Sequence, residues 1–174
     1  NVWRSLELVP VFAPAGGIVP LQELGQDIND CQNPQALEIL VFPGADGRFT
    51  LREDDGLYPG VNCEQRSGEV RTEIVYDDAL GTLTIHPAEG CTDALPALRS
   101  WTVTMRGVEK PTQVSVNGDS TEFAYDPDTL SVCVTIHEAE VSQELEVSFA
   151  CGKRPAFAEN PVENDIYQAL LRCE

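Results

Sequence analysis

Three consecutive acidic residues, Glu53, Asp54 and Asp55, are the first group in this sequence that could do chemistry. Neighbouring carboxylates can bind calcium or act as an acid–base pair. Their spacing does not fit an EF-hand loop, in which acidic residues alternate with others before a glutamate. Consecutive strand residues also point to opposite faces, so these carboxylates are poorly placed to converge. We therefore interpret the cluster, and Asp46 before it, as turn residues.

Two histidines are the next candidates for catalysis or metal binding. His86 and His137 each follow a Thr-Ile step at the end of an expected strand. Neither has a cysteine or histidine partner at zinc-ligand spacing. The sequence also lacks the Gly-x-Ser-x-Gly nucleophile turn and both common glycine-rich nucleotide loops. We therefore assign no catalytic residue, no metal ligand and no cofactor to this chain.

Aromatic side chains could instead form a stacking surface for a sugar. Trp101 alternates with Val103 and Met105 along an expected strand, with threonines between them, so we expect the tryptophan to lie in a core. Tyr58, in a Leu-Tyr-Pro-Gly loop, is the better candidate for surface contact. It is the one substrate-binding residue that the sequence suggests.

The elements that must position these residues are short runs rich in β-branched and aromatic residues, each followed by turn-forming residues. The clearest runs lie at 6–12, 37–42, 48–53, 70–76, 82–86, 100–106, 112–117, 130–136 and 144–149. Repeated antiparallel strands with no helix between them make a sandwich or a barrel.

Three of the connections have recognisable turn chemistry. Residues 44–47, Gly-Ala-Asp-Gly, should close a hairpin between two apolar runs, with glycine supplying the positive φ. Asn117-Gly118 lies at a strand end, and the proline of residues 126–128 sets φ in a turn.

One helix is expected, over residues 160–173. Asn160 can cap it, Pro161 suits the first helical position and Glu163 completes a capping box. Apolar positions then recur at helical spacing, at Val162, Ile166, Leu170 and Cys173. No stop signal follows, and the chain opens inside strand-like apolar sequence. We therefore expect both ends to be cuts in a longer polypeptide.

The charge balance excludes two classes of partner. Eleven basic residues face 29 acidic ones among 174 residues, which gives a formal net charge of -18. Such a surface repels nucleic acid and anionic lipid, so we expect neither as a partner. No apolar run approaches the roughly 20 residues of a membrane-spanning helix. The six cysteines are dispersed, which favours reduced thiols in a cytoplasmic protein.

Residues 37–56, LEILVFPGADGRFTLREDDG, closely resemble a characteristic segment of glycoside hydrolase family 31, the α-glucosidases and α-xylosidases. Three other segments are similar to family stretches and occur in the family's order: LVPVFAPAGGIVPL at 8–21, YDDALGTLTI at 76–85 and SVNGDSTEFAYDPDTLSVCV at 115–134. The chain departs from the family pattern at Ala13-Pro14, where Val-Arg is usual, and at Arg52, where tyrosine is common.

The strand runs and the capping residues predict an antiparallel β-sandwich with a short C-terminal helix, and the resemblance implies how the chain is divided. Residues 1–24 would be the tail of a proximal C-terminal sandwich, residues 25–152 the distal C-terminal sandwich, and residues 153–174 a linker and truncated helix. In the family a (β/α)8 barrel precedes these parts and carries the two aspartates of a retaining glycosidase. No catalytic residue of the family maps onto this chain.

We therefore expect a non-catalytic accessory domain that is inactive alone. Its implied partners are the barrel and the proximal sandwich of the same polypeptide, and it would stabilise the barrel or an oligomer interface. The alternative is a carbohydrate-binding module that binds an oligosaccharide, because sandwiches often carry sugars on aromatic faces or loops. A third reading, a complete small hydrolase, has no residue to support it.

Overall fold

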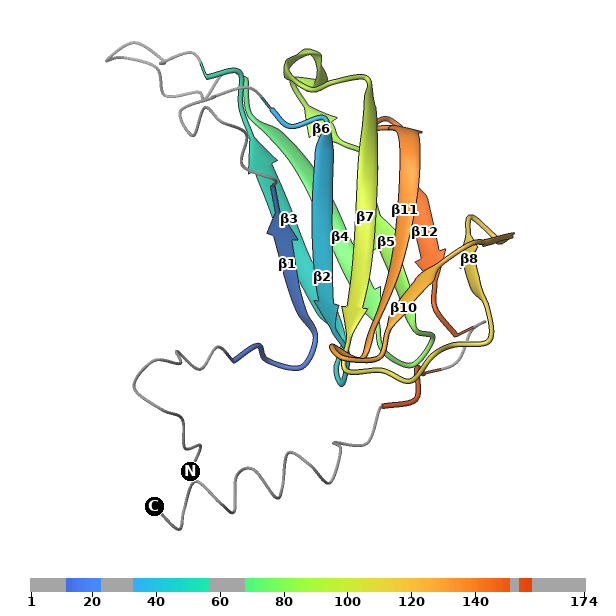
Figure 1. Cartoon of the computed structure of the whole chain (residues 1–174). Helices are drawn as coiled ribbons and strands as arrows, with labels where there is room; N and C mark the ends of the chain where they lie inside the picture. The colour runs from blue at the N-terminus through green and yellow to red at the C-terminus, as the bar shows by residue number, and fades with distance from the viewer. Residues whose placement is uncertain (1–11, 23–32, 57–67, 151–153, 158–174) are drawn as a thin grey trace.

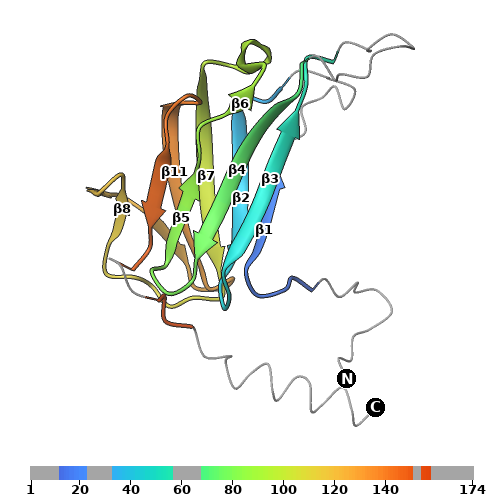
Figure 2. The same ribbon diagram turned by 180° about the vertical axis from the view of Figure 1, so that it is seen from behind.

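The computed structural model describes residues 12–22, 33–56, 68–150 and 154–157. This part of the chain is almost entirely β-structure, and its helical content is one 3₁₀ turn, η1, at Thr92–Ala94. None of its helical structure is long and apolar enough to span a bilayer. Figure 1 and Figure 2 show two facing sheets from opposite sides. The predicted all-β sandwich is confirmed, and the helix predicted at 160–173 lies outside the described residues.

The first sheet has five strands. In spatial order they are β1 (Gly17–Leu21), β2 (Ala36–Phe42), β7 (Leu98–Arg106), β11 (Ser131–Glu140) and β10 (Ala124–Asp126). Neighbours are antiparallel except β2 and β7, which are parallel. Along β7, Trp101, Val103 and Met105 point into the core and are buried, as their alternation predicted.

The second sheet has seven strands, all paired antiparallel. They are β3 (Gly47–Glu53), β4 (Val70–Asp77), β5 (Thr82–Ile85), β12 (Leu145–Ser148), β8 (Val114–Val116) and β9 (Asp119–Thr121), with β6 (Glu89–Gly90) beside β4. Alternate residues of both sheets meet between them in one apolar core, which includes Ile39, Ile74, Leu83, Val103 and Val147. Burial of this shared core holds the two layers together.

The loop of residues 43–46 does not close a hairpin, which corrects the prediction made for the Gly-Ala-Asp-Gly turn. β2 pairs with β1 and β7 in the first sheet, whereas β3 pairs with β4 in the second. The chain therefore crosses from one sheet to the other at this loop. Turn chemistry specifies that the chain reverses, but it does not specify which strand each arm pairs with.

The Asn117-Gly118 turn is a two-residue hairpin between β8 and β9. Val116 pairs with Asp119, and the two turn residues have φ angles of 50° and 87°. A right-handed strand twist favours this pair of positive φ angles in a two-residue loop, and Asn-Gly adopts them at little cost. β10 and β11 pair across the turn predicted at residues 126–128.

β1 lies at one edge of the first sheet and pairs with β2 along its whole length. Its Ile18 side chain is buried in the common core. The division of the chain into residues 1–24, 25–152 and 153–174 stays a prediction. In the described structure residues 17–21 are built into the same sandwich as the strands that follow.

Candidate functional site

The three consecutive acids are separated by the fold. Glu53 ends β3 and turns its carboxylate toward Arg99 of β7, with Oε1 2.8 Å from Nη2 and Oε2 2.9 Å from Nη1. The two side chains are 7% and 0% exposed. The Arg99 guanidinium also donates from Nε to the Pro34 carbonyl at 3.0 Å and lies 5.5 Å from the centroid of the Trp101 ring. This bidentate pair joins the two sheets.

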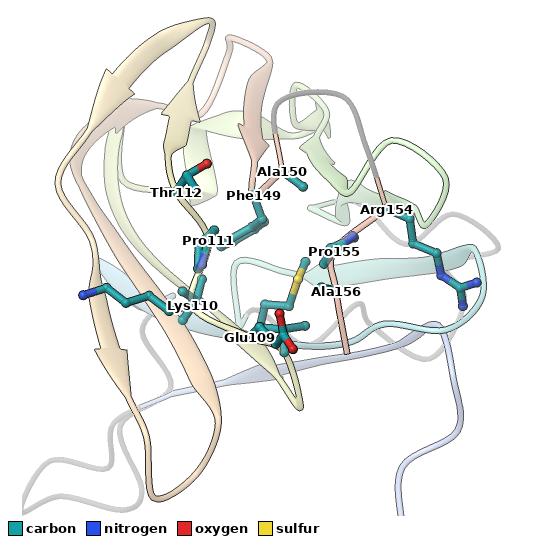
Figure 3. A pocket seen from close by; sticks show the side chains of 12 residues that line it. Glu109, Lys110, Pro111, Thr112, Phe149, Ala150, Arg154, Pro155 and Ala156 are labelled. Carbon is teal, nitrogen blue, oxygen red and sulfur yellow. The ribbon is translucent and has the colours of Figure 1, made fainter. Parts of the chain in front are cut away.

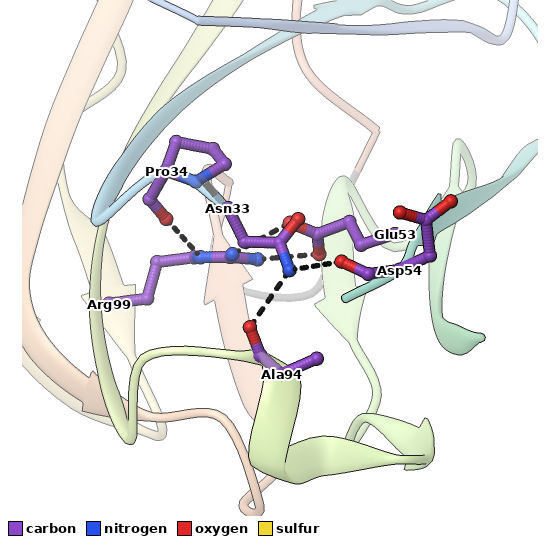
Figure 4. Close-up of polar contacts among 6 residues, drawn as sticks. All are labelled: Asn33, Pro34, Glu53, Asp54, Ala94 and Arg99. Carbon is purple, nitrogen blue, oxygen red and sulfur yellow. Dashed lines mark hydrogen bonds and ion pairs between the residues drawn. The ribbon is translucent and has the colours of Figure 1, made fainter. Parts of the chain in front are cut away.

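Asn33 extends the same network, which Figure 4 shows in close-up. Its Nδ2 donates to the carbonyl oxygens of Asp54 and Ala94, both at 2.8 Å. The Asp54 carboxylate faces away from Glu53 and accepts the Gly56 N–H at 2.8 Å, so it forms a local turn. The segment before β2, the end of β3 and η1 are thereby tied together. The Glu53 carboxylate binds Arg99 and the Asp54 carboxylate binds a backbone N–H, so the two do not converge on one ligand.

A second acidic cluster lies at the opposite end of the sandwich, where the 43–46 loop crosses. The buried Asp78 carboxylate accepts the Gly44 N–H at 2.7 Å and pairs with Nε of Arg154 at 2.8 Å. Asp46 accepts the backbone N–H of Asp78 at 3.0 Å. Burial, with the Asp78 charge beside it, raises the pKa of Tyr76 well above its usual value. The carboxylates of Asp46 and Asp78 therefore hold backbone N–H groups and the Arg154 side chain in place.

A pocket of about 240 Å³ opens at this end, between the two sheets. Figure 3 shows Phe149 on one side of it and Arg154 with Pro155 on another. Met105 and Val132 contribute apolar walls, and Glu109 is the one acidic side chain that lines it. A single carboxylate cannot supply both the acid and the base or nucleophile that glycoside hydrolysis requires.

A second hollow, of about 450 Å³, lies on the outer face of the second sheet. Arg52 and Arg71 face each other across β3 and β4, and Glu69 lies between them, 2.8 and 3.1 Å from their guanidinium nitrogens. The hydrogen bond from Arg71 lowers the pKa of Glu69. Glu73 pairs in the same way with Arg48 at 2.7 Å. The lowered pKa makes Glu69 a poor general acid.

The other residues singled out in the sequence lie apart from these hollows or at their edges. His86 pairs with Glu144, Nδ1 to Oε2, at 2.9 Å, and His137 is exposed on β11. Trp101 is buried and offers no face to a sugar. Tyr58 lies outside the described residues. Within the described ranges no three potential ligands group around a metal position.

Known proteins include one with a related sequence and others with the same fold. No family model matches the sequence. An α-xylosidase of Saccharolobus solfataricus is 27% identical over 128 residues, which is 70% of this chain and 17% of that enzyme. A family 31 dextranase of Flavobacterium johnsoniae, solved with isomaltotriose, shares the fold with a TM-score of 0.64 at 16% identity. The chain matches the C-terminal region of glycoside hydrolase family 31.

The matched region is a small part of the proteins that this chain resembles. The match to the dextranase covers 78% of this chain, but only 19% of the dextranase chain. The crossing loop and the first part of β3 carry the segment most like the family, Pro-Gly-Ala-Asp-Gly at 43–47 and Phe-Thr-Leu at 49–51. Sequence reasoning missed the partner of Glu53, since Arg99 lies 46 residues away and no local pattern links the two.

Proposed function

We propose that this region is a non-catalytic accessory domain of an α-glycoside hydrolase, and that it supports a catalytic barrel in the same polypeptide. The observation that carries the proposal is the position of Glu53, the acid of the family-like segment that lies at the end of β3. Its carboxylate is paired with the buried Arg99, and its side chain is only 7% exposed. Bond cleavage is then the work of another part of the polypeptide.

The proposal also states where the complete enzyme, of which this region would be a part, carries its catalytic residues. Two carboxylates about 5–5.5 Å apart are needed for retaining hydrolysis, and we place them in the barrel. The α-xylosidase and dextranase names of the two relatives favour α-xylosides or α-glucosides as substrates of the whole enzyme. The sandwich would contribute apolar contact and stability to that enzyme.

The test is an assay of the purified 174-residue chain on aryl α-glucosides and α-xylosides. We expect no turnover by the chain and turnover by the complete polypeptide of the same reading frame. Hydrolysis by the chain that survives further purification would overturn the proposal.

Sugar binding without hydrolysis is tested by the same preparation. Titration with maltose, isomaltose and xylo-oligosaccharides should give no saturable heat or fluorescence change. Saturable binding that is lost in Tyr58→Ala would instead make the chain a carbohydrate-binding module.

A further inference from the structure

The Asn117-Gly118 turn is held against β12 through the side chain of Asn117. The backbone ladder between β8 and β12 reaches the pair of Val116 and Val147, and Asn117 and Glu146 come next. The Asn117 N–H donates to the Glu146 carbonyl at 2.8 Å, and the Glu146 N–H donates at 2.8 Å to Oδ1 of Asn117. A side-chain amide oxygen thus takes the place that a backbone carbonyl has in a regular ladder. Both turn residues are exposed, and the hairpin lies beside β12 in Figure 1.

An asparagine followed by glycine carries a reactive pair of groups. The backbone nitrogen of the glycine can attack Cγ of the asparagine amide. A C–N bond forms, the side-chain nitrogen leaves as ammonia with the proton of the attacking nitrogen, and a five-membered succinimide remains. Water then opens the succinimide at either carbonyl, which gives aspartate or isoaspartate. Glycine has no side chain to hinder the attacking nitrogen. Asn117-Gly118 is the one Asn-Gly pair among the 174 residues.

The turn geometry separates the two reacting groups. Asn117 has a φ of 50°, in the left-handed region. In that region Cβ lies close to the carbonyl oxygen that follows it. The next nitrogen is on the opposite side of the planar carbonyl carbon, so it points away from Cβ and from the Cγ that it would have to attack. The hydrogen bond from Glu146 to Oδ1 also holds the side-chain amide in place. The folded hairpin therefore opposes a reaction that its sequence favours.

We propose that Asn117 is a site of spontaneous deamidation that the β8–β9 hairpin controls. The succinimide forms only in molecules whose hairpin has opened and released Asn117 from Glu146. This inference is independent of the proposed function. The aspartate product keeps the turn, because Asp-Gly adopts the same positive φ angles and a carboxylate oxygen still accepts the Glu146 N–H. The isoaspartate product has one more carbon atom in its main chain, so it cannot form the two-residue turn. Isoaspartate thus converts a transient opening of the hairpin into a lasting one.

The first test compares deamidation rates. The 174-residue chain and a synthetic peptide of residues 113–122, the unfolded reference, are incubated in the same mildly alkaline buffer. Mass spectrometry with isoaspartate detection follows the product at Asn117. We expect the folded chain to react at least about tenfold more slowly than the peptide, because the opened hairpin is a minor population. Asn33 precedes a proline, which has no N–H to act as nucleophile, and should stay unmodified. Equal rates in chain and peptide, or no reaction in the peptide, would overturn the proposal.

A substitution beneath the hairpin tests the control by opening. Val114 of β8 is fully buried, and Val114→Ala leaves a cavity there, so the hairpin should open more often and Asn117 should react about fivefold faster or more. Ser120→Ala, on the exposed strand β9, is the matched control and should react at the wild-type rate. In the wild type, urea below the unfolding midpoint should raise the rate in the same way. A rate that neither Val114→Ala nor urea changes would overturn the proposal.

The two products give a third measurement. Asn117→Asp reproduces the aspartate product, and its urea midpoint should lie close to that of the wild type. In chains that carry isoaspartate, separated by chromatography, the amides of β8 and β9 should exchange with solvent about tenfold faster or more. Isoaspartate chains whose hairpin amides exchange like those of Asn117→Asp would overturn the claim that this modification keeps the hairpin open.

Discussion

Arg99 brings a full positive charge into the interior of the sandwich, where its side chain is 0% exposed. Taking two charges out of water costs several kcal/mol per ion, and a bidentate pair with further hydrogen bonds offsets that cost. Glu53, the Pro34 carbonyl and the Trp101 ring together satisfy the guanidinium. Removal of one partner therefore costs far more than the intact pair contributes.

The first prediction concerns that asymmetry. Arg99→Met should lower the free energy of unfolding by about 3–5 kcal/mol, because the Glu53 carboxylate is left buried without a partner. Urea denaturation measures the loss. Arg48→Met, in the exposed pair with Glu73, should cost no more than about 1 kcal/mol. Adding Glu53→Leu to Arg99→Met should recover part of the stability, and a strictly additive double variant would contradict the explanation.

The second prediction concerns Tyr76, whose pKa is raised by burial and then by the Asp78 charge. Below about pH 10, the usual tyrosine pKa, the phenol is neutral in both states and its contribution is fully present. As the pH rises past that value the unfolded chain loses the proton while the folded chain keeps it, so stability falls. Tyr76→Phe should flatten this fall. An unchanged slope of unfolding free energy between about pH 9.5 and 11 would contradict it.

At the scale of elements, the runs predicted from 37–42 onward each coincide with a strand. Their alternation was readable because one face of each strand is buried. The sequence did not reveal β6 or β9, since strands of two or three residues are too short for a period-two pattern. β1 was missed because Gly17 and Pro20 have low β-strand propensity. This segment is a strand because it pairs with β2 along its whole length.

The third prediction belongs to the crossing loop. Gly47→Ala should destabilise the chain by about 1–3 kcal/mol, because the added methyl group meets the backbone of Gly16 and neither backbone can yield. Ala45→Ser, in the same loop but exposed, should change the unfolding free energy by no more than about 0.5 kcal/mol. Thermal or urea unfolding measures both. Equal effects would show that the close approach of the two segments does not constrain the loop.

For the whole molecule, the net charge of -18 on 174 residues makes self-repulsion a general term in stability. The ion pairs on the outer face of the second sheet oppose it locally, but they are exposed and weak. Long-range repulsion among unpaired acids is what remains, and it is screened over about 10 Å at 0.1 M salt.

The fourth prediction follows from that repulsion. The melting temperature of the chain should rise when sodium chloride is raised from about 0.01 to 0.15 M. Added salt shortens the distance over which the acidic side chains repel one another, so the folded state is destabilised less. Addition of EDTA should leave the melting temperature unchanged, because no metal ligand set was identified among the described residues. A fall with salt would mean that the ion pairs outweigh the repulsion. A fall with EDTA would reveal a bound metal.

The sequence by itself determined the class of this protein. Period-two alternation, Asn-Gly at a strand end and the family-like segment at 37–56 are local patterns, and each is legible within a few neighbouring residues. Only the tertiary structure decided that the loop at 43–46 crosses between sheets, that Glu53 meets Arg99, and that Ala15 and Phe157 both lie beside Gly44. Those outcomes depend on which surfaces pack together across long stretches of chain. That choice is made by burial of a shared core, which no short window of sequence contains.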